Sequence, residues 1–379
     1  MTKPPPPLPV ILLTGFLGSG KTTLLNYLLG HEAMADTAVI INEFGEIGLD
    51  HLFVEAVEDG IIEMASGCLC CTIRGDLVNT LEDLLRRLDN RRGPPFSRVL
   101  IESTGLADPA PILHTIMSHP YLVMRYRLGA VITCVDSVNG MQTLDAHQEA
   151  VKQAAMADRL VLTKTDLPEA EAGLPALKAR LSSLNPAAPQ IDMHSAPATP
   201  DELLEAGLYN PKSKIPDVAA WLGQEAYAER DRREHDHGHH HSHHHDPNRH
   251  DDHIRAFCIT HDEPVAESAL QVFLQLLQSQ YGEQLLRMKG IVALREAPET
   301  PYVLHAVQNI MHPPACLAAW PDQDHRCRLV FIMRDVDEDF IRKLFFGCIA
   351  PLSAEDSALL AEADNPLALG PGRGLLNDL

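Results

Sequence analysis

Seven short apolar runs, each followed by a polar or glycine-rich segment, divide the first half of the chain. They predict strands at residues 10–13, 38–41, 61–64, 99–101, 130–135, 160–162 and 190–193. Segments with apolar residues at helical spacing separate several of them, as at Leu77, Leu81, Leu84, Leu85 and Leu88. Strands that alternate with helices are typical of a parallel sheet covered on both faces. The pattern therefore predicts an α/β fold with a mostly parallel sheet.

The order of elements changes in the last third of the chain. Apolar runs predict strands at residues 254–259, 291–294, 302–307 and 329–333. Apolar residues at helical spacing predict one helix around Ala269–Leu277, and acidic residues open a second at Asp337–Phe346. This β-α-β-β-β-α order predicts a small antiparallel sheet with helices on one face, which is a second domain of the α+β class.

A histidine-rich segment, residues 230–253, separates the two patterns. Its histidines alternate with Asp, Arg and Gly, and such a composition cannot bury a core, so we expect a linker. Neutral imidazole is a common metal ligand, which favours weak capture of several ions over a merely solvated linker or an expression tag. The candidate ligands in its centre are His239, His240, His241, His243, His244 and His245.

These patterns divide the chain of 379 residues into five parts. They are a disordered Pro-rich lead (1–9), the α/β domain (10–229), the linker (230–253), the α+β domain (254–350) and a tail (351–379). The net charge of −21 argues against a nucleic-acid or anionic-membrane partner. No run of 18 apolar residues predicts a membrane span, and no export signal opens the chain, so we expect a cytoplasmic protein.

The segment Gly15–Thr22, with the sequence GFLGSGKT, carries the clearest chemical signal. It lies between an apolar strand and a helical segment, the context that a phosphate-binding P-loop requires. Glycines let consecutive N–H groups face a phosphate, and the helix N-terminus favours an anion. We expect Lys21 to reach the β- and γ-phosphates and the Thr22 hydroxyl to bind Mg²⁺. The expected nucleotide contacts are Gly15, Gly18, Ser19, Gly20, Lys21, Thr22 and Thr23.

Two later strand ends add candidate groups. Glu102 ends an apolar strand and is the candidate second group for Mg²⁺, the alternative being an ordinary strand-end acid. Thr163-Lys164-Thr165-Asp166 stands where GTPases carry Asn-Lys-x-Asp. The Asp166 carboxylate would accept two hydrogen bonds from guanine that adenine cannot donate, which predicts GTP as the nucleotide. Thr163, Lys164 and Asp166 are therefore expected to contact it.

Three cysteines crowd into four positions of a glycine-led loop at Cys68, Cys70 and Cys71. Their thiolates suit Zn²⁺ or Cu(I), whereas isolated cysteines are usually small buried apolar residues. In an extended segment Cys68 and Cys70 point one way and Cys71 the other, so a further ligand must come from elsewhere. Glu43, in the polar stretch after the second strand, is the candidate.

Four segments together resemble the CobW family of GTPases. They are residues 15–22, 42–48 (NEFGEIG), 67–71 (GCLCC) and 102–109 (ESTGLADP). The His-rich linker and the small second domain are similar too, so the resemblance covers about residues 8–350. It implies hydrolysis of GTP with Mg²⁺ by a site that includes Lys21, Thr22 and Glu102. It also implies binding of Zn²⁺ and its delivery to a client metalloprotein.

Thr163 departs from the family pattern, where Asn is usual. A cobalt-handling GTPase of cobalamin synthesis remains an alternative, as does a metal-buffering protein with an inactive P-loop. The sequence leaves the client and a possible homo-oligomer open. Because Asn42–Cys71 follows the P-loop and precedes the strand that starts at Val99, we expect nucleotide state and zinc affinity to be coupled through this stretch.

Overall fold

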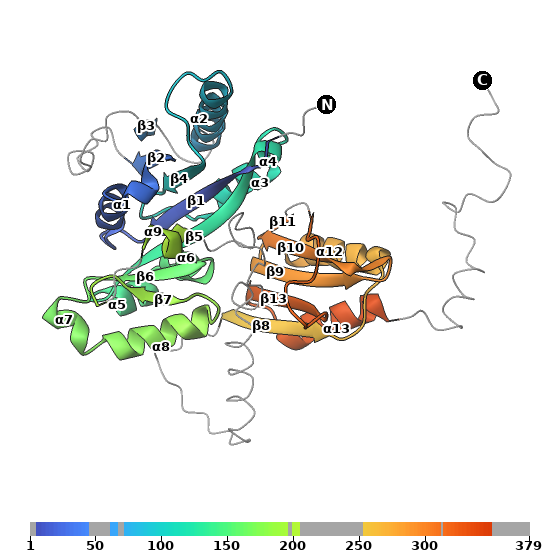
Figure 1. Ribbon diagram of the computed structural model, residues 1–379. Coiled ribbons are helices and arrows are strands. Elements are labelled where there is room, and N and C mark those ends of the chain that lie inside the picture. Colours follow the sequence, from blue (N-terminus) through green and yellow to red (C-terminus); the bar gives the residue numbers. More distant parts are fainter. Residues whose placement is uncertain are drawn as a thin grey trace, which may run out of the picture.

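The computed structural model describes residues 5–44, 61–66, 72–195, 199–204, 253–311 and 314–350. Within these ranges the chain forms two sheets that lie side by side (Figure 1). Residues 205–252, which contain almost all of the predicted linker, are outside the described ranges, as is the tail after Ala350.

The first sheet has seven parallel strands in the order β3-β2-β4-β1-β5-β6-β7. They are β1 (Leu8–Gly15), β2 (Thr37–Phe44), β3 (Ile61–Ser66), β4 (Arg98–Glu102), β5 (Tyr126–Asp136), β6 (Arg159–Thr163) and β7 (Gln190–Asp192). The predicted parallel α/β sheet is therefore confirmed. β2 continues three residues beyond the predicted run, because its backbone pairs with β3 as far as Phe44 and Ser66.

Helices cover both faces of this sheet, since alternate residues of each strand are apolar on both sides. Ile11 and Leu13 face α1 (Lys21–Leu29), the 3₁₀ turn η1 (Glu32–Met34) and α9 (Pro200–Leu204). Val10 and Leu12 face a larger layer on the other side. That layer contains α2 (Thr72–Asp89), α3 (Ala110–Ser118), α4 (Leu122–Arg125), α5 (Gly140–Ala146), α6 (Gln148–Ala155) and α8 (Leu174–Leu184). The short α7 (Pro168–Glu171) follows β6.

The second sheet is antiparallel, with the order β11-β10-β9-β13-β8 and β12 paired to β10. Its strands are β8 (Ile254–His261), β9 (Leu285–Leu294), β10 (Ala297–Val307), β11 (Ile310–Met311), β12 (Ala315–Cys316) and β13 (Cys327–Arg334). Two helices, α12 (Glu267–Tyr281) and α13 (Glu338–Ile349), pack on one face through Phe273 and Phe345. This confirms the predicted α+β unit. β9 starts six residues earlier than predicted. The prediction missed its first part because Arg287 and Lys289 interrupt the apolar run there.

The other face of the second sheet packs against the first part of the chain. Ala256, Ile291 and Ile332 share one apolar core with residues of α3, α6 and α8. The two cations that interrupt β9 lie in this interface, where Arg287 and Lys289 both bind the Asp158 carboxylate. Among the helices that the structure describes, none has the length and apolar character needed to cross a lipid bilayer.

Candidate nucleotide-binding site

The loop Gly15–Thr22 joins β1 to α1 in a conformation that only glycine allows at key positions. Gly15 and Gly20 have φ values of 141° and 86°, in the left-handed region. A Cβ atom at Gly15 would lie 2.5 Å from the Cys134 carbonyl oxygen on β5. The loop closes through a hydrogen bond of 3.1 Å from Ser19 N–H to Phe16 O. The first turn of α1 follows, and the N–H groups of a helix N-terminus favour an anion.

Lys21 is the first residue of α1, and its ammonium group lies over the loop. Its Nζ atom donates to the carbonyl oxygens of Gly15, at 3.0 Å, and Phe16, at 3.2 Å. The positive charge is therefore held beside the turn that carries the loop N–H groups. A phosphate bound by those groups would lie within its reach.

Thr22 and Glu102 meet although they are far apart in the sequence. β1 and β4 are neighbours in register, with Leu13 opposite Glu102. The Thr22 hydroxyl lies 3.4 Å from Glu102 Oε1, and Glu102 is buried. A hydroxyl and a carboxylate are hard oxygen ligands, so this pair fits a divalent cation such as Mg²⁺ beside the phosphates.

Thr163, at the end of β6, is fixed to the P-loop. Its hydroxyl lies 2.8 Å from the Ser19 carbonyl oxygen and 3.2 Å from that of Val135. Its side chain also packs against Gly20, where an added Cβ would lie 3.3 Å from the threonine methyl carbon. A hydroxyl group can therefore tie β6 to the P-loop at this position.

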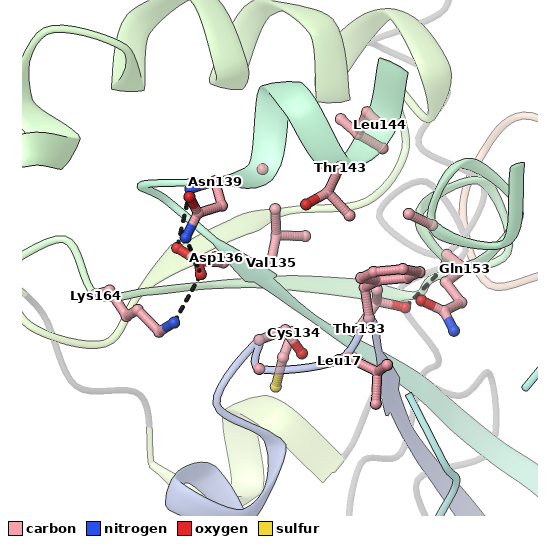
Figure 2. Close-up of a pocket in the computed structure, with 15 residues that line it drawn as sticks. Leu17, Thr133, Cys134, Val135, Asp136, Asn139, Thr143, Leu144, Gln153 and Lys164 are labelled. Carbon is pink, nitrogen blue, oxygen red and sulfur yellow. Dashed lines mark hydrogen bonds and ion pairs between the residues drawn. The ribbon is translucent and has the colours of Figure 1, made fainter. Parts of the chain in front are cut away.

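Lys164 is oriented by a carboxylate at the end of β5 (Figure 2). Its Nζ atom donates to Asp136 Oδ2 at 2.7 Å, and Asn139 Nδ2 donates to the same oxygen at 3.1 Å. Burial acts to raise the pKa of Asp136, but the hydrogen bonds from Lys164 and Asn139 outweigh it and lower the pKa. Asp136 therefore stays ionised and holds the lysine in place.

Asp166 is exposed at the start of the segment that follows Lys164. The neighbouring Thr165 hydroxyl donates to Asp192 Oδ1 at 2.5 Å, which joins this segment to the end of β7. Asp192 also accepts hydrogen bonds from the N–H groups of His194 and Ser195. These bonds outweigh burial and lower the pKa of Asp192 to about 2. An ionised Asp192 thus joins the segment after β6 to the segment after β7.

The predicted zinc ligands lie largely outside the part of the chain that the structure describes. Cys68, Cys70, Cys71 and the linker histidines His239–His245 lie outside the described residues, and of Glu43 only the backbone is described. The β2–β3 register pairs Glu43 with Ala65. Ala65 precedes Cys68 by three residues in the sequence. Elsewhere in the described ranges, no group of three or more His, Cys, Asp or Glu is arranged to hold a metal ion.

Sequence reasoning missed three residues of this site. Asp136 and Asp192 each end a strand of the parallel sheet, which is the same signal that singled out Glu102. Gln153 lies within α6 and has no signal in the sequence. Its side chain points to the loop after β4, as the contacts below show.

Comparison with known proteins gives matches over both sheets. The model of the CobW/HypB/UreG nucleotide-binding domain matches residues 9–192, and that of the cobalamin synthesis protein cobW C-terminal domain matches residues 254–349. The chain is 32% identical over 349 residues to the zinc chaperone YjiA of Escherichia coli, covering 90% of this chain and 98% of the relative.

Two further similarities agree with these. The crystal structure of Zn(II)-bound YjiA GTPase from E. coli superposes with a TM-score of 0.62 at 28% identity, covering 91% of this chain and 100% of that one. The zinc-regulated GTPase metalloprotein activator 1 of Schizosaccharomyces pombe is 33% identical over 173 residues, which are 44% of this chain and 41% of the relative.

Proposed function

The chain belongs to the CobW family of P-loop nucleotide-binding proteins, and from this premise we propose that it is a GTP-hydrolysing zinc metallochaperone. In this proposal it binds GTP at the P-loop, holds Zn²⁺ at the cysteine cluster and passes the ion to a client metalloprotein. One observation supports the nucleotide part above all others. The ends of β1, β4 and β6 bring Lys21, the Thr22–Glu102 pair and Thr163 together around one loop.

Each residue has a proposed role in the reaction. Lys21 and the loop N–H groups bind and orient the phosphates, and Thr22 with Glu102 would hold Mg²⁺, which neutralises developing charge on them. Thr163 and Lys164 hold the nucleotide-binding loops in place, and Asp166 accepts hydrogen bonds from guanine. The P-loop segment 15–22 and the segment 102–109 contain no arginine that could stabilise charge on the transferred phosphate. We therefore expect slow hydrolysis in the isolated protein.

The zinc part of the proposal rests on the chemistry of the cysteines and on strand pairing. Thiolates at Cys68, Cys70 and Cys71 bind Zn²⁺ tightly once deprotonated. The pairing of Phe44 with Ser66 sets β2, which carries Glu43, beside β3, which ends two residues before Cys68 in the sequence. This adjacency supports Glu43 as the further ligand. Such free thiols require a reducing compartment, so we place the protein in the cytoplasm. The His-rich linker would then capture further ions weakly.

A two-part experiment tests this function. Phosphate release is measured with GTP and with ATP, for the natural sequence and for Lys21→Ala. We expect release from GTP only, and none from the variant, because the variant lacks the cation that binds the phosphates. Zinc affinity is then measured against a chelator with GDP, with a non-hydrolysable GTP analogue and without nucleotide.

We expect the zinc affinity to differ between the nucleotide states by roughly 5- to 150-fold, the range of typical couplings. Equal release from ATP and GTP would contradict the guanine assignment. Tight zinc binding without any hydrolysis would instead favour a metal-buffering protein, and stronger binding of Co²⁺ than Zn²⁺ would favour a cobalt-handling GTPase.

A further inference from the structure

We propose that Gln153, a buried residue of α6, is a positioning residue for the loop Ser103–Asp108 and fixes Gly105 where its backbone can contact the third phosphate of a bound nucleotide. This inference rests on the proposed GTPase function. It concerns a residue that belongs neither to the P-loop motif nor to the predicted metal ligands.

The loop Ser103–Asp108 runs directly beside the P-loop. At its start, Ser103 donates from its N–H group to Leu13 O at 2.9 Å and from its hydroxyl to Thr14 Oγ1 at 2.9 Å. Gly105 then packs so closely on the P-loop that an added Cβ would lie 2.6 Å from the Leu17 nitrogen. In P-loop proteins a loop in this place responds to the third phosphate. The position of Gly105 should therefore matter for a triphosphate and much less for a diphosphate.

Gln153 holds the middle of this loop. Its Nε2 atom donates to Gly105 O at 3.2 Å and to Ala107 O at 3.0 Å. The side chain is 1% exposed. The orientation of the amide is determined by its partners, because the opposite orientation would face its oxygen to two carbonyl oxygens. Both donor positions of one side chain are thus directed to the backbone of this one loop.

The backbone of Gln153 is itself anchored to the sheet. The Thr133 hydroxyl on β5 donates to Gln153 O at 2.8 Å (Figure 2). The strand β5 therefore fixes the position of α6 relative to the sheet. The helix α6 in turn fixes the loop Ser103–Asp108. A rigid support of this kind is what a positioning contact needs, since small displacements at a reacting centre change rates strongly.

The carbonyl oxygen of the Gln153 side chain is in an unfavourable environment. The Oε1 atom is buried without a hydrogen-bond partner. The residue Gln153 lines a cavity of about 270 Å³ that is also lined by Phe16, Leu17, Gly18 and Ser19 of the P-loop. A buried acceptor without a partner is unfavourable and calls for an explanation. The explanation is that Gln153 must direct both of its side-chain N–H groups to the loop backbone, which leaves its oxygen without a hydrogen-bond partner.

A second contact from α6 fixes the end of the same loop. Lys152 Nζ lies 2.8 Å from Asp108 Oδ2, while Asp108 Oδ1 accepts from the N–H group of Ala110 at 2.9 Å. Both side chains of this ion pair are about one quarter exposed, at 22% and 26%. Water screens this pair more than the buried amide, so we assign the main positioning role to Gln153.

The test compares Gln153→Met with a matched control, Asn185→Asp. The Met side chain keeps the size and removes both donors. Asn185 is also a buried amide, and its Nδ2 donates to the carbonyl oxygens of Ala154, Ala155 and Ala157 at the end of α6, away from the loop. Dissociation constants for GDP and for a non-hydrolysable GTP analogue, kcat for GTP and the melting temperature are measured for each protein.

We expect Gln153→Met to weaken binding of the GTP analogue and to lower kcat by on the order of 10- to 100-fold, with GDP affinity nearly unchanged. Asn185→Asp should lower the melting temperature but keep the ratio of GDP to GTP-analogue affinity. If Gln153→Met does not fold, Gln153→Asn, which keeps the amide but shortens its reach, should show the same selective loss.

Equal losses for GDP and the GTP analogue, or a Gln153→Met profile matching that of Asn185→Asp, would show a purely structural residue and overturn the inference. Measurements on the protein with the natural sequence distinguish a failure of this inference from a failure of the proposed function. If it neither hydrolyses GTP nor binds the analogue, the function itself is wrong and the inference falls with it.

Discussion

The Thr163 hydroxyl joins three segments at the nucleotide site. Thr163 lies on β6, Ser19 belongs to the P-loop, and Val135 is near the end of β5. One hydroxyl has one proton, so it can donate to only one of these two carbonyl oxygens at a time. An asparagine amide has two N–H groups and could donate to both.

Replacing this threonine tests whether its hydroxyl stabilises the P-loop. Thr163→Val keeps the shape but removes the donor, so we expect a loss of about 1 kcal/mol in stability and weaker GDP binding. Thr163→Asn should retain both properties. Thermal melts and GDP titrations measure them. A Thr163→Val protein indistinguishable from the natural sequence would mean that shape alone fixes the loop.

Gly105 is a second position where a single added carbon atom would disturb the nucleotide site. In Gly105→Ala the new Cβ would lie 2.6 Å from the Leu17 nitrogen, and backbone cannot move aside as a flexible side chain would. We expect hydrolysis to fall by roughly 100-fold, because the loop must shift away from the P-loop. Gly173→Ala is the control, since nothing lies within 4 Å of its Cβ position. Equal activity of the two variants would show that the close approach is unimportant.

At the level of elements, the helix α6 contacts both sheets. Its side chains Lys152 and Gln153 hold the loop after β4, and directly after the helix the carbonyl of Met156 accepts from Arg287 on β9. One helix thus contacts both the loop beside the P-loop and the second sheet. This arrangement gives a physical route between them, although contact alone does not establish coupling.

The helix α13 supports the second sheet and begins with a defined N-cap. Asp337 has an extended backbone, and its Oδ1 accepts from the N–H group of Asp339 at 3.0 Å. We expect Asp337→Ala to lower stability by about 1 kcal/mol, whereas Asp337→Asn, an equally good cap, should be nearly neutral. Urea denaturation measures this, with GTP hydrolysis unchanged in both proteins. A neutral Ala variant would show that packing of Phe345 alone holds the helix.

At the scale of the whole molecule, a buried charge cluster joins the two parts of the chain. Arg287 Nη2 lies 2.8 Å from both oxygens of Asp158, and Lys289 Nζ lies 2.6 Å from Oδ1. The three side chains are at most 10% exposed. Burial acts to raise the pKa of Asp158, but the charges of Arg287 and Lys289 lower it well below its usual range. Two cations therefore share one carboxylate.

This shared carboxylate predicts unequal effects of removing the three side chains. Asp158→Ala would leave two cations in the interface and should destabilise the protein by about 3–5 kcal/mol. Lys289→Met leaves the balanced Asp158–Arg287 pair, so we expect stability at pH 7 to be retained or increased. Urea denaturation of both variants measures the difference. A Lys289→Met protein as unstable as Asp158→Ala would show that the lysine charge is required.

The effect of Lys289 on stability should depend on pH in a definite direction. Burial lowers the pKa of Lys289 to about 8, whereas a lysine in the unfolded chain has a pKa of about 10.4. Between these values the unfolded chain binds more protons, so the lysine contribution to stability rises with pH. The natural protein should therefore gain stability relative to Lys289→Met from about pH 8 upwards. A difference that does not change between pH 7 and pH 10 would contradict this.

The sequence by itself determined the parallel and antiparallel sheets, the P-loop and the strand-end acid Glu102. Their signals are local, since periodicity and glycine spacing act over a few residues and the backbone follows them directly. It also identified Thr163 as a departure from the asparagine that is usual in the family. It did not show which groups the threonine hydroxyl binds.

The tertiary structure alone decided which distant groups meet. Thr163 and Ser19 are 144 residues apart, and Arg287 and Asp158 are 129 apart. The strand order β4-β1-β5-β6 brings the first pair together, and the docking of β9 on α6 brings the second. Arg287 and Lys289 looked like a break in a strand because local patterns carry no information about a partner supplied by another part of the chain. Gln153 had no signal for the same reason, since its function depends on the loop packed against it.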